Sequence, residues 1–150
     1  MRPHLTLLAL ALTSCRASAP AQAPIDLWVA HPKAEVVTLA AAAATSAGFV
    51  VTKSDTAAGA LAAMREAEGD GNGDYLRCEQ GQGQGGAPVG FSSKVTVSVV
   101  ARDAAGGARV GISAEVRFAR TGVIGPGGRV MEWTCGSSGE IERVILAALR

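Results

Sequence analysis

The clearest pattern in the chain is an alternation of apolar and polar residues in two neighbouring segments, residues 95–101 and 110–118. Successive side chains of a strand point to opposite faces, so the alternation predicts two strands that each bury one face. Between them, Ala104-Ala-Gly-Gly107 has the composition of a turn. The two segments therefore predict a long antiparallel hairpin. The residues expected on its buried face are Val95, Val97, Val99, Ala101, Val110, Ile112, Ala114, Val116 and Phe118.

Helical signals occur near both ends of the chain. Pro32 at the first helical position and Gly48 as a stop signal predict a helix over residues 32–47. A second helix is expected to start at Ser137, whose hydroxyl would cap the backbone while Glu140 reaches back. The expected packing residues are Val36, Ala40, Ala43, Ala44 and Ala47 in the first helix, and Ile141, Val144, Ile145, Ala148 and Leu149 in the second.

Shorter apolar runs predict further strands over residues 49–53, 74–80 and 129–135. In the middle one, alternation assigns Leu76 and Cys78 to the inward face and Tyr75, Arg77 and Glu79 to the other. In the last one, Met131, Trp133 and Cys135 share a face.

Residues 57–68 leave two structures open. Their composition is helical, but the turn residues Ser54, Asp55 and Gly59 favour the return arm of a hairpin over residues 60–66, and we favour the strand. The order of elements predicts an α+β fold, with an antiparallel β-sheet and an N-terminal and a C-terminal helix packed on one face.

The N-terminal segment has the features of an export signal. Arg2 precedes an apolar run over residues 5–12, which is far shorter than the roughly 20 residues of a membrane-spanning helix. Leu12-Thr13-Ser14-Cys15 follows directly and resembles the lipobox of bacterial lipoproteins, in which the cysteine receives the lipid and becomes the mature N-terminus. Ordinary secretory cleavage after Ala19 or Ala23 is the alternative.

The resulting division of the chain is a signal peptide over residues 1–14, a lipidated Cys15 with a tether over residues 15–24, and a single domain over residues 25–150. The chain has 14 basic and 13 acidic residues, and removal of Arg2 with the signal leaves equal numbers. A neutral protein has no electrostatic footprint for nucleic acid. Contact with a membrane is therefore expected only through the lipid on Cys15.

Cys78 and Cys135 remain once Cys15 is assigned to the lipid. An even number of cysteines in an exported protein predicts a disulfide, and both residues are expected on the inward face of their strands. We therefore expect a Cys78–Cys135 bond that staples the domain.

Two glycine-rich motifs resemble ligand sites without completing them. Gly81-x-Gly83-x-x-Gly86 has the letters of a dinucleotide fingerprint, but no helix follows it to receive a pyrophosphate. Asp70, Asn72 and Asp74 have the spacing of the first ligands of a calcium loop, but its sixth position is Tyr75 and its twelfth is Gly81. We expect a flexible loop and a polar turn, with no cofactor and no metal.

Candidate catalytic residues are few in the mature chain. His31 is its single histidine and flanks a helix, while Ser137 and Ser138 are explained by capping. Glu140 and Glu142 diverge on one helix, so they make a poor acid and base pair. We expect no enzymatic activity. The aromatic residues best suited to anchor a partner are Trp28, Phe91 and Trp133, with Trp28 and Phe91 near segment ends where exposure is expected.

The lipobox, the segments Gly48-Phe-Val-Val51 and Tyr75-Leu-Arg-Cys78, the hairpin and the segment Cys135–Glu142 together resemble small bacterial envelope lipoproteins. The domain is loosely similar to accessory lipoproteins of outer-membrane assembly complexes. This resemblance implies a lipid-anchored, periplasm-facing binding or structural module. Since Arg16 and not Asp follows the cysteine, it also implies the outer membrane. The alternative is a lipoprotein inhibitor or binder of a periplasmic enzyme such as a hydrolase.

Overall fold

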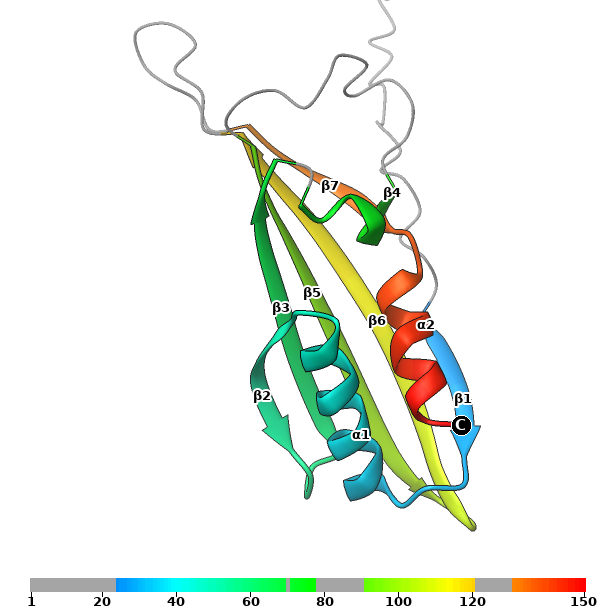
Figure 1. Ribbon diagram of the computed structural model, residues 1–150. Helices are drawn as coiled ribbons and strands as arrows, with labels where there is room; N and C mark the ends of the chain where they lie inside the picture. Colours follow the sequence, from blue (N-terminus) through cyan, green and yellow to red (C-terminus); the bar gives the residue numbers. More distant parts are fainter. Residues whose placement is uncertain (1–23, 70, 78–90, 121–130) are drawn as a thin grey trace, which may run out of the picture.

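The computed structural model describes residues 24–69, 71–77, 91–120 and 131–150. Within them the fold is α+β, with a seven-stranded sheet in which all pairs are antiparallel and two helices that lie on the same side of it (Figure 1). The strand order is β2-β3-β5-β6-β7-β4, and β1 pairs with β6. The elements are β1 (Ile25–Val29), α1 (Lys33–Ser46), β2 (Val50–Asp55), β3 (Ala60–Glu68), a 3-10 turn (Gly73–Tyr75), β4 (Leu76–Arg77), β5 (Phe91–Ala104), β6 (Gly107–Arg120), β7 (Met131–Ser137) and α2 (Glu140–Ala148).

The predicted hairpin is confirmed and is longer than the pattern indicated. β5 and β6 each span 14 residues and are paired from Phe91 opposite Arg120 to Ala104 opposite Gly107. One face of the hairpin is buried under the helices, as the alternation predicts. Its buried residues are Val95, Val97, Val99, Ala101, Ala108, Val110, Ile112 and Val116.

Two short strands share the second edge of β6. β1 pairs with its first half, from Val29 opposite Ala108 to Ile25 opposite Ile112, and β7 pairs with Val116 to Arg120. The sequence analysis missed β1 as a strand, although Ile25, Leu27 and Val29 alternate with polar or aromatic residues. A strand of five residues carries too few repeats to stand out.

The first helix is confirmed with two corrections. Pro32 is the N-cap residue and lies just outside the helix, so it is not the first helical position, and Gly48 ends the segment with a φ of 81°. Val37 is fully buried and belongs to the packing face, which the predicted set omitted. Lys33 joins the start of α1 to the end of β5 through Asp103, with Nζ 2.9 Å from the carboxylate.

The strand alternative for residues 60–66 is correct, since β3 spans Ala60–Glu68 and has a paired strand on each side. The helical composition of the segment is overridden by these two hydrogen-bonded ladders and by the burial of Leu61 and Ala63.

The strand predicted over residues 74–80 is shorter, and one of its assignments is wrong. Gly73–Tyr75 forms a 3-10 turn, and only Leu76–Arg77 pair with β7. Tyr75 points inward and contacts the ring of Phe49 edge-on at 5.3 Å between centroids, because the turn breaks the alternation. Cys78 and Glu79 lie outside the described residues.

The C-terminal helix starts later than Ser137 and is capped differently. Gly139 is its N-cap residue and Glu140 its first residue. The Ser137 hydroxyl accepts a hydrogen bond from Gly139 N at 3.1 Å and donates one to Glu142 Oε2 at 2.9 Å. Glu142 is therefore the carboxylate that reaches back, while Glu140 forms an ion pair with Arg143. Ile141, Ile145 and Leu149 are buried as predicted.

Val37→Asp should destabilise the domain by several kcal/mol, because it buries an unpaired carboxylate where Val37 is fully enclosed. Thr38→Asp on the exposed side of the same helix turn should change the free energy of unfolding by about 0.5 kcal/mol or less. Urea denaturation followed by circular dichroism measures both. Equal midpoints for the two variants would show that the burial of this helix face is wrong.

Candidate interaction surface

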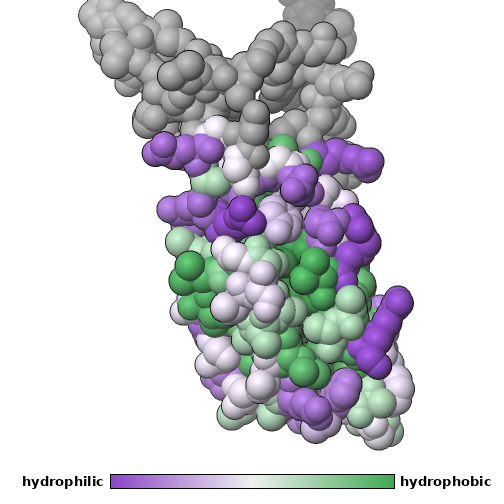
Figure 2. All heavy atoms as spheres, in the orientation of Figure 1, coloured by the Kyte–Doolittle hydropathy of each residue, from purple (hydrophilic) through white to green (hydrophobic). Residues whose placement is uncertain are grey.

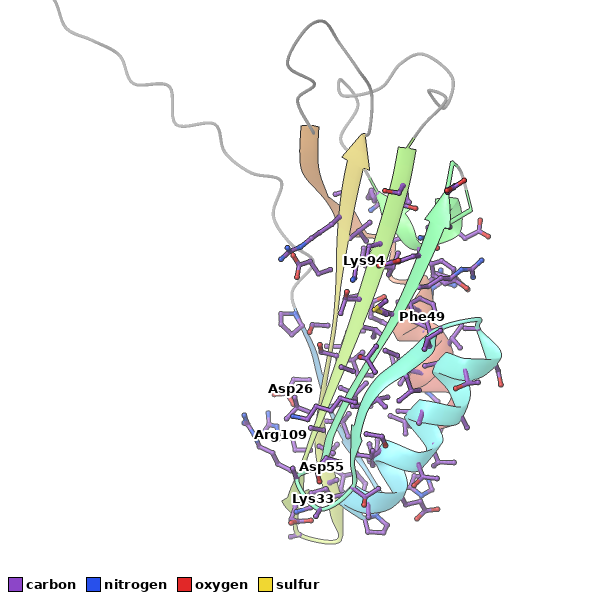
Figure 3. The ribbon with its side chains drawn as sticks, turned by 90° about the vertical axis from the view of Figure 1, so that its left-hand side faces the viewer. Asp26, Lys33, Phe49, Asp55, Lys94 and Arg109 are labelled. Carbon is purple, nitrogen blue, oxygen red and sulfur yellow. The ribbon has the colours of Figure 1, made fainter. Side chains whose placement is uncertain are left out.

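One face of the sheet carries both helices, and no described element covers the other, which we call the helix-free face (Figure 3). Strand register defines it, since directly paired residues share a face. Its described side chains and glycine are Asp26 and Trp28 of β1; Val50, Lys53 and Asp55 of β2; Ala60, Ala62, Met64, Glu66 and Glu68 of β3; Ser92, Lys94, Thr96, Ser98, Val100 and Arg102 of β5; and Arg109, Gly111, Ser113, Glu115 and Arg117 of β6.

The middle of the helix-free face is uncharged on β3, β5 and β6, and most of its side chains are small. Its residues on these strands, the uncharged centre, are Ala60, Ala62, Met64, Thr96, Ser98, Val100, Gly111 and Ser113. A Cβ atom added at Gly111 would meet no closer heavy atom than one at 3.9 Å, so the surface above this glycine is open. Charged residues lie around this centre.

The charges at the rim are largely paired with one another. Lys94 Nζ lies 3.0 Å from Glu66, Arg109 Nε 3.0 Å from Asp26, and Arg117 Nε 2.8 Å from Glu115. The hydrogen bond and the charge of Asp26 raise the pKa of the Arg109 guanidinium. Exposed pairs of this kind contribute little to stability, so their main effect here is to leave the face without strong net charge.

All three large apolar side chains that are exposed in the described part of the chain lie on this face. They are Trp28, Val50 and Val100, with 56%, 66% and 44% of their surface exposed. Trp28 shares a register row with Arg109 and Arg102, and tryptophan and arginine are the residue types most enriched at binding hot spots. The expected exposure of Trp28 is confirmed, while the side chains of Phe91 and Trp133 lie outside the description. In the orientation of Figure 1, apolar and polar side chains are mixed over the surface (Figure 2).

The calcium-like motif does not assemble a site within the described residues. Asn72 is fully buried, and its Nδ2 donates to Ser93 O at 3.1 Å and to Ser93 Oγ at 3.0 Å. Asp74 is exposed, and residue 70 is outside the description. No group of three or more His, Cys, Asp or Glu residues that could hold a metal occurs in the part of the chain that the structure describes. Asn72 instead connects its turn to β5 through these two hydrogen bonds.

The candidate catalytic residues are dispersed. His31 Nδ1 lies 3.3 Å from Glu35, at the start of α1, whereas Ser137 is bonded to Glu142. Ser138 Oγ lies 2.5 Å from the Asp74 carbonyl to which it donates. Cys135 is buried on β7 opposite Val116. Cys15 and Gly81, Gly83 and Gly86 of the dinucleotide-like motif lie outside the described residues.

Arg65 is a half-buried charge that sequence reasoning missed. Its Nη1 donates to Ala47 O at 3.1 Å and to the Tyr75 hydroxyl at 3.4 Å, and its Nη2 donates to Gly71 O at 3.2 Å. Its guanidinium also lies over the Tyr75 ring, 5.2 Å from the centroid. α1 has no basic residue in its last turn, so Arg65 supplies the positive charge at the negative end of that helix. Its role is therefore structural.

No protein-family model and no curated protein matches the chain. Neither helix of the described residues is long and apolar enough to cross a membrane. Among the described residues, the helix-free face carries all three of the large apolar side chains that are exposed.

Arg65→Met should lower the free energy of unfolding by about 1–3 kcal/mol, because hydrogen bonds from a charged donor to three oxygens are lost at the end of α1. The free energy of unfolding of Arg65→Lys should lie between those of the wild type and Arg65→Met, since lysine keeps the charge but not the planar set of donors. Urea denaturation measures the change, with Arg77→Met at an exposed position as the matched control. A wild-type midpoint for Arg65→Met would contradict the capping role.

Proposed function

We propose that the protein is a lipid-anchored, periplasm-facing and non-enzymatic binding or structural module of the bacterial envelope. The anchor rests on Leu12-Thr13-Ser14-Cys15 directly after the apolar run, and Arg16 after the cysteine favours the outer membrane. β1 begins at Ile25, which leaves residues 15–24 as a tether. Ten extended residues reach at most about 35 Å, so the domain would stay close to the membrane surface.

The observation that carries the binding role is the distribution of exposed apolar residues. Trp28, Val50 and Val100 all lie on the sheet face that no described helix covers. Val100 belongs to the uncharged centre, whereas Val50 and Trp28 lie on the edge strands β2 and β1. Protein interfaces have this composition, with charges depleted in the middle and polar groups at the edge. The helices already use the other face of the sheet, so a partner would occupy this one.

We further propose that Cys78 and Cys135 form a disulfide. β4 pairs with β7 with Arg77 opposite Gly136, and Cys78 follows Arg77 while Cys135 precedes Gly136. Antiparallel register advances one residue in each strand in opposite directions, so a ladder that continued one residue further would oppose 78 and 135. Opposed residues have Cα atoms about 4.5–5.5 Å apart, which is within the range of a disulfide.

The binding role is tested by capture of the tagged full chain from crosslinked envelopes, followed by mass spectrometry of the bound proteins. Recovery of envelope proteins, including further copies of the chain, supports the module. Recovery of a single hydrolase instead supports the inhibitor alternative. Val100→Glu on the helix-free face should reduce the recovery, whereas Ala42→Glu on the exposed side of α1 is the matched control.

Cys15→Ser should abolish lipidation and leave either an unlipidated precursor or a secreted protein, because one cysteine carries the acyl chains. Mass spectrometry of the wild-type N-terminus measures the modification. An unmodified Cys15, with cleavage after Ala19 or Ala23, would contradict the anchor.

Cys135→Ala should lower the free energy of unfolding by about 4 kcal/mol, since the bond would close a loop of about 58 residues. Cys78→Ala should have a closely similar effect, and the double variant should add little to either. Thiol titration of protein recovered under oxidising conditions gives the direct readout. Two free thiols would overturn the pairing.

A further inference from the structure

We infer that the helix-free face is covered by a second copy of this chain, so that two sheets pack face to face. This inference rests on the proposal that the face is a binding surface, and it names the occupant. The starting point is that the β5–β6 hairpin buries valines on one side, while the opposite side presents the uncharged centre.

The side chains of the centre permit a close approach of another sheet. On its middle register row, Ala62, Ser98 and Ser113 lie side by side on β3, β5 and β6, with Lys53 of β2 at the end of the row. On the next row, Gly111 adds no side chain beside Val100. Two sheets in face-to-face contact stand about 10 Å apart, and small residues allow that spacing without large adjustments. Val50 and Val100 lie on the two adjacent rows and Trp28 lies on the row beyond Val100, and all three supply exposed surface to be buried.

The charges of the face suit an identical partner. The described rim carries equal numbers of basic and acidic residues, namely Lys53, Lys94, Arg102, Arg109 and Arg117 against Asp26, Asp55, Glu66, Glu68 and Glu115. A second copy of such a face would therefore meet no net electrostatic repulsion. A nucleic acid or an anionic lipid surface would need a net positive field, which this face does not offer.

The size of the face is that of a stable interface. The lengths of β1, β2, β3, β5 and β6, at about 3.3 Å per residue and about 4.8 Å between strands, give a projected area of roughly 750 Å². A standard protein interface buries about 800 Å² on each partner. Contact over all five strands, charged rim included, would therefore approach the area that a dimer requires.

The test uses two differently tagged copies of the full chain, expressed together in a bacterial host and extracted from membranes with excess detergent. Capture of one tag should recover the other, and light scattering should give twice the protein mass of one chain. Ser98→Arg, which places a charge in the centre, should reduce the recovery at least tenfold. Val100→Glu, at a site that is already exposed, should act in the same direction.

Ala42→Arg on the exposed side of α1 is the control and should leave recovery unchanged. Circular dichroism confirms that each variant is folded. A monomeric wild-type protein would overturn the inference. So would Ser98→Arg and Val100→Glu variants that associate as strongly as the wild type. If the variants instead lose the capture of a different protein, self-association is overturned and the proposed function stands. If no protein is captured at all, self-association and the proposed function are both contradicted.

Discussion

The paired backbones of β5 and β6 are the interaction on which the rest of the structure depends. The two 14-residue strands form a ladder without a register shift, and every other strand except β2 and β4 pairs directly with one of them. β3 is attached to β5, while β1 and β7 share the other edge of β6. The valines on one side of this ladder form the floor on which α1 and α2 pack. A register slip of one residue would exchange the two faces and bring serines under the helices.

The strength of each sequence signal decided which elements could be predicted. The hairpin repeats its alternation over many residues, and α1 has a stop glycine in the left-handed region at Gly48, so both were predicted closely. β3 was favoured on its flanking turns although its composition is helical. β1 has only five residues, too few for the alternation of Ile25, Leu27 and Val29 to be recognised.

The errors arose where a distant partner decides the local conformation. Tyr75 turns inward because Phe49, Arg65 and the Ala47 carbonyl receive its ring and hydroxyl, and none of these is near it in sequence. Ser137 is engaged by Glu142 where the capping pattern indicated Glu140. For the candidate surface, alternation predicts which residues avoid the core, but only the register across strands brings Trp28, Val50 and Val100 to one face.

The proposed anchor and the proposed surface reinforce each other through geometry. The proposed tether would precede β1 in the sequence, and β1 contributes Asp26 and Trp28 to the helix-free face, so the proposed anchoring and binding would involve the same edge of the domain. Tethering to a membrane confines the chain to a thin layer and raises its effective concentration there. The exposed apolar groups of the face are Trp28 and two valines, which provide only modest apolar burial, so confinement at a membrane would increase the fraction of associated copies. Small side chains and paired polar groups also limit the apolar area that this large sheet face exposes to water.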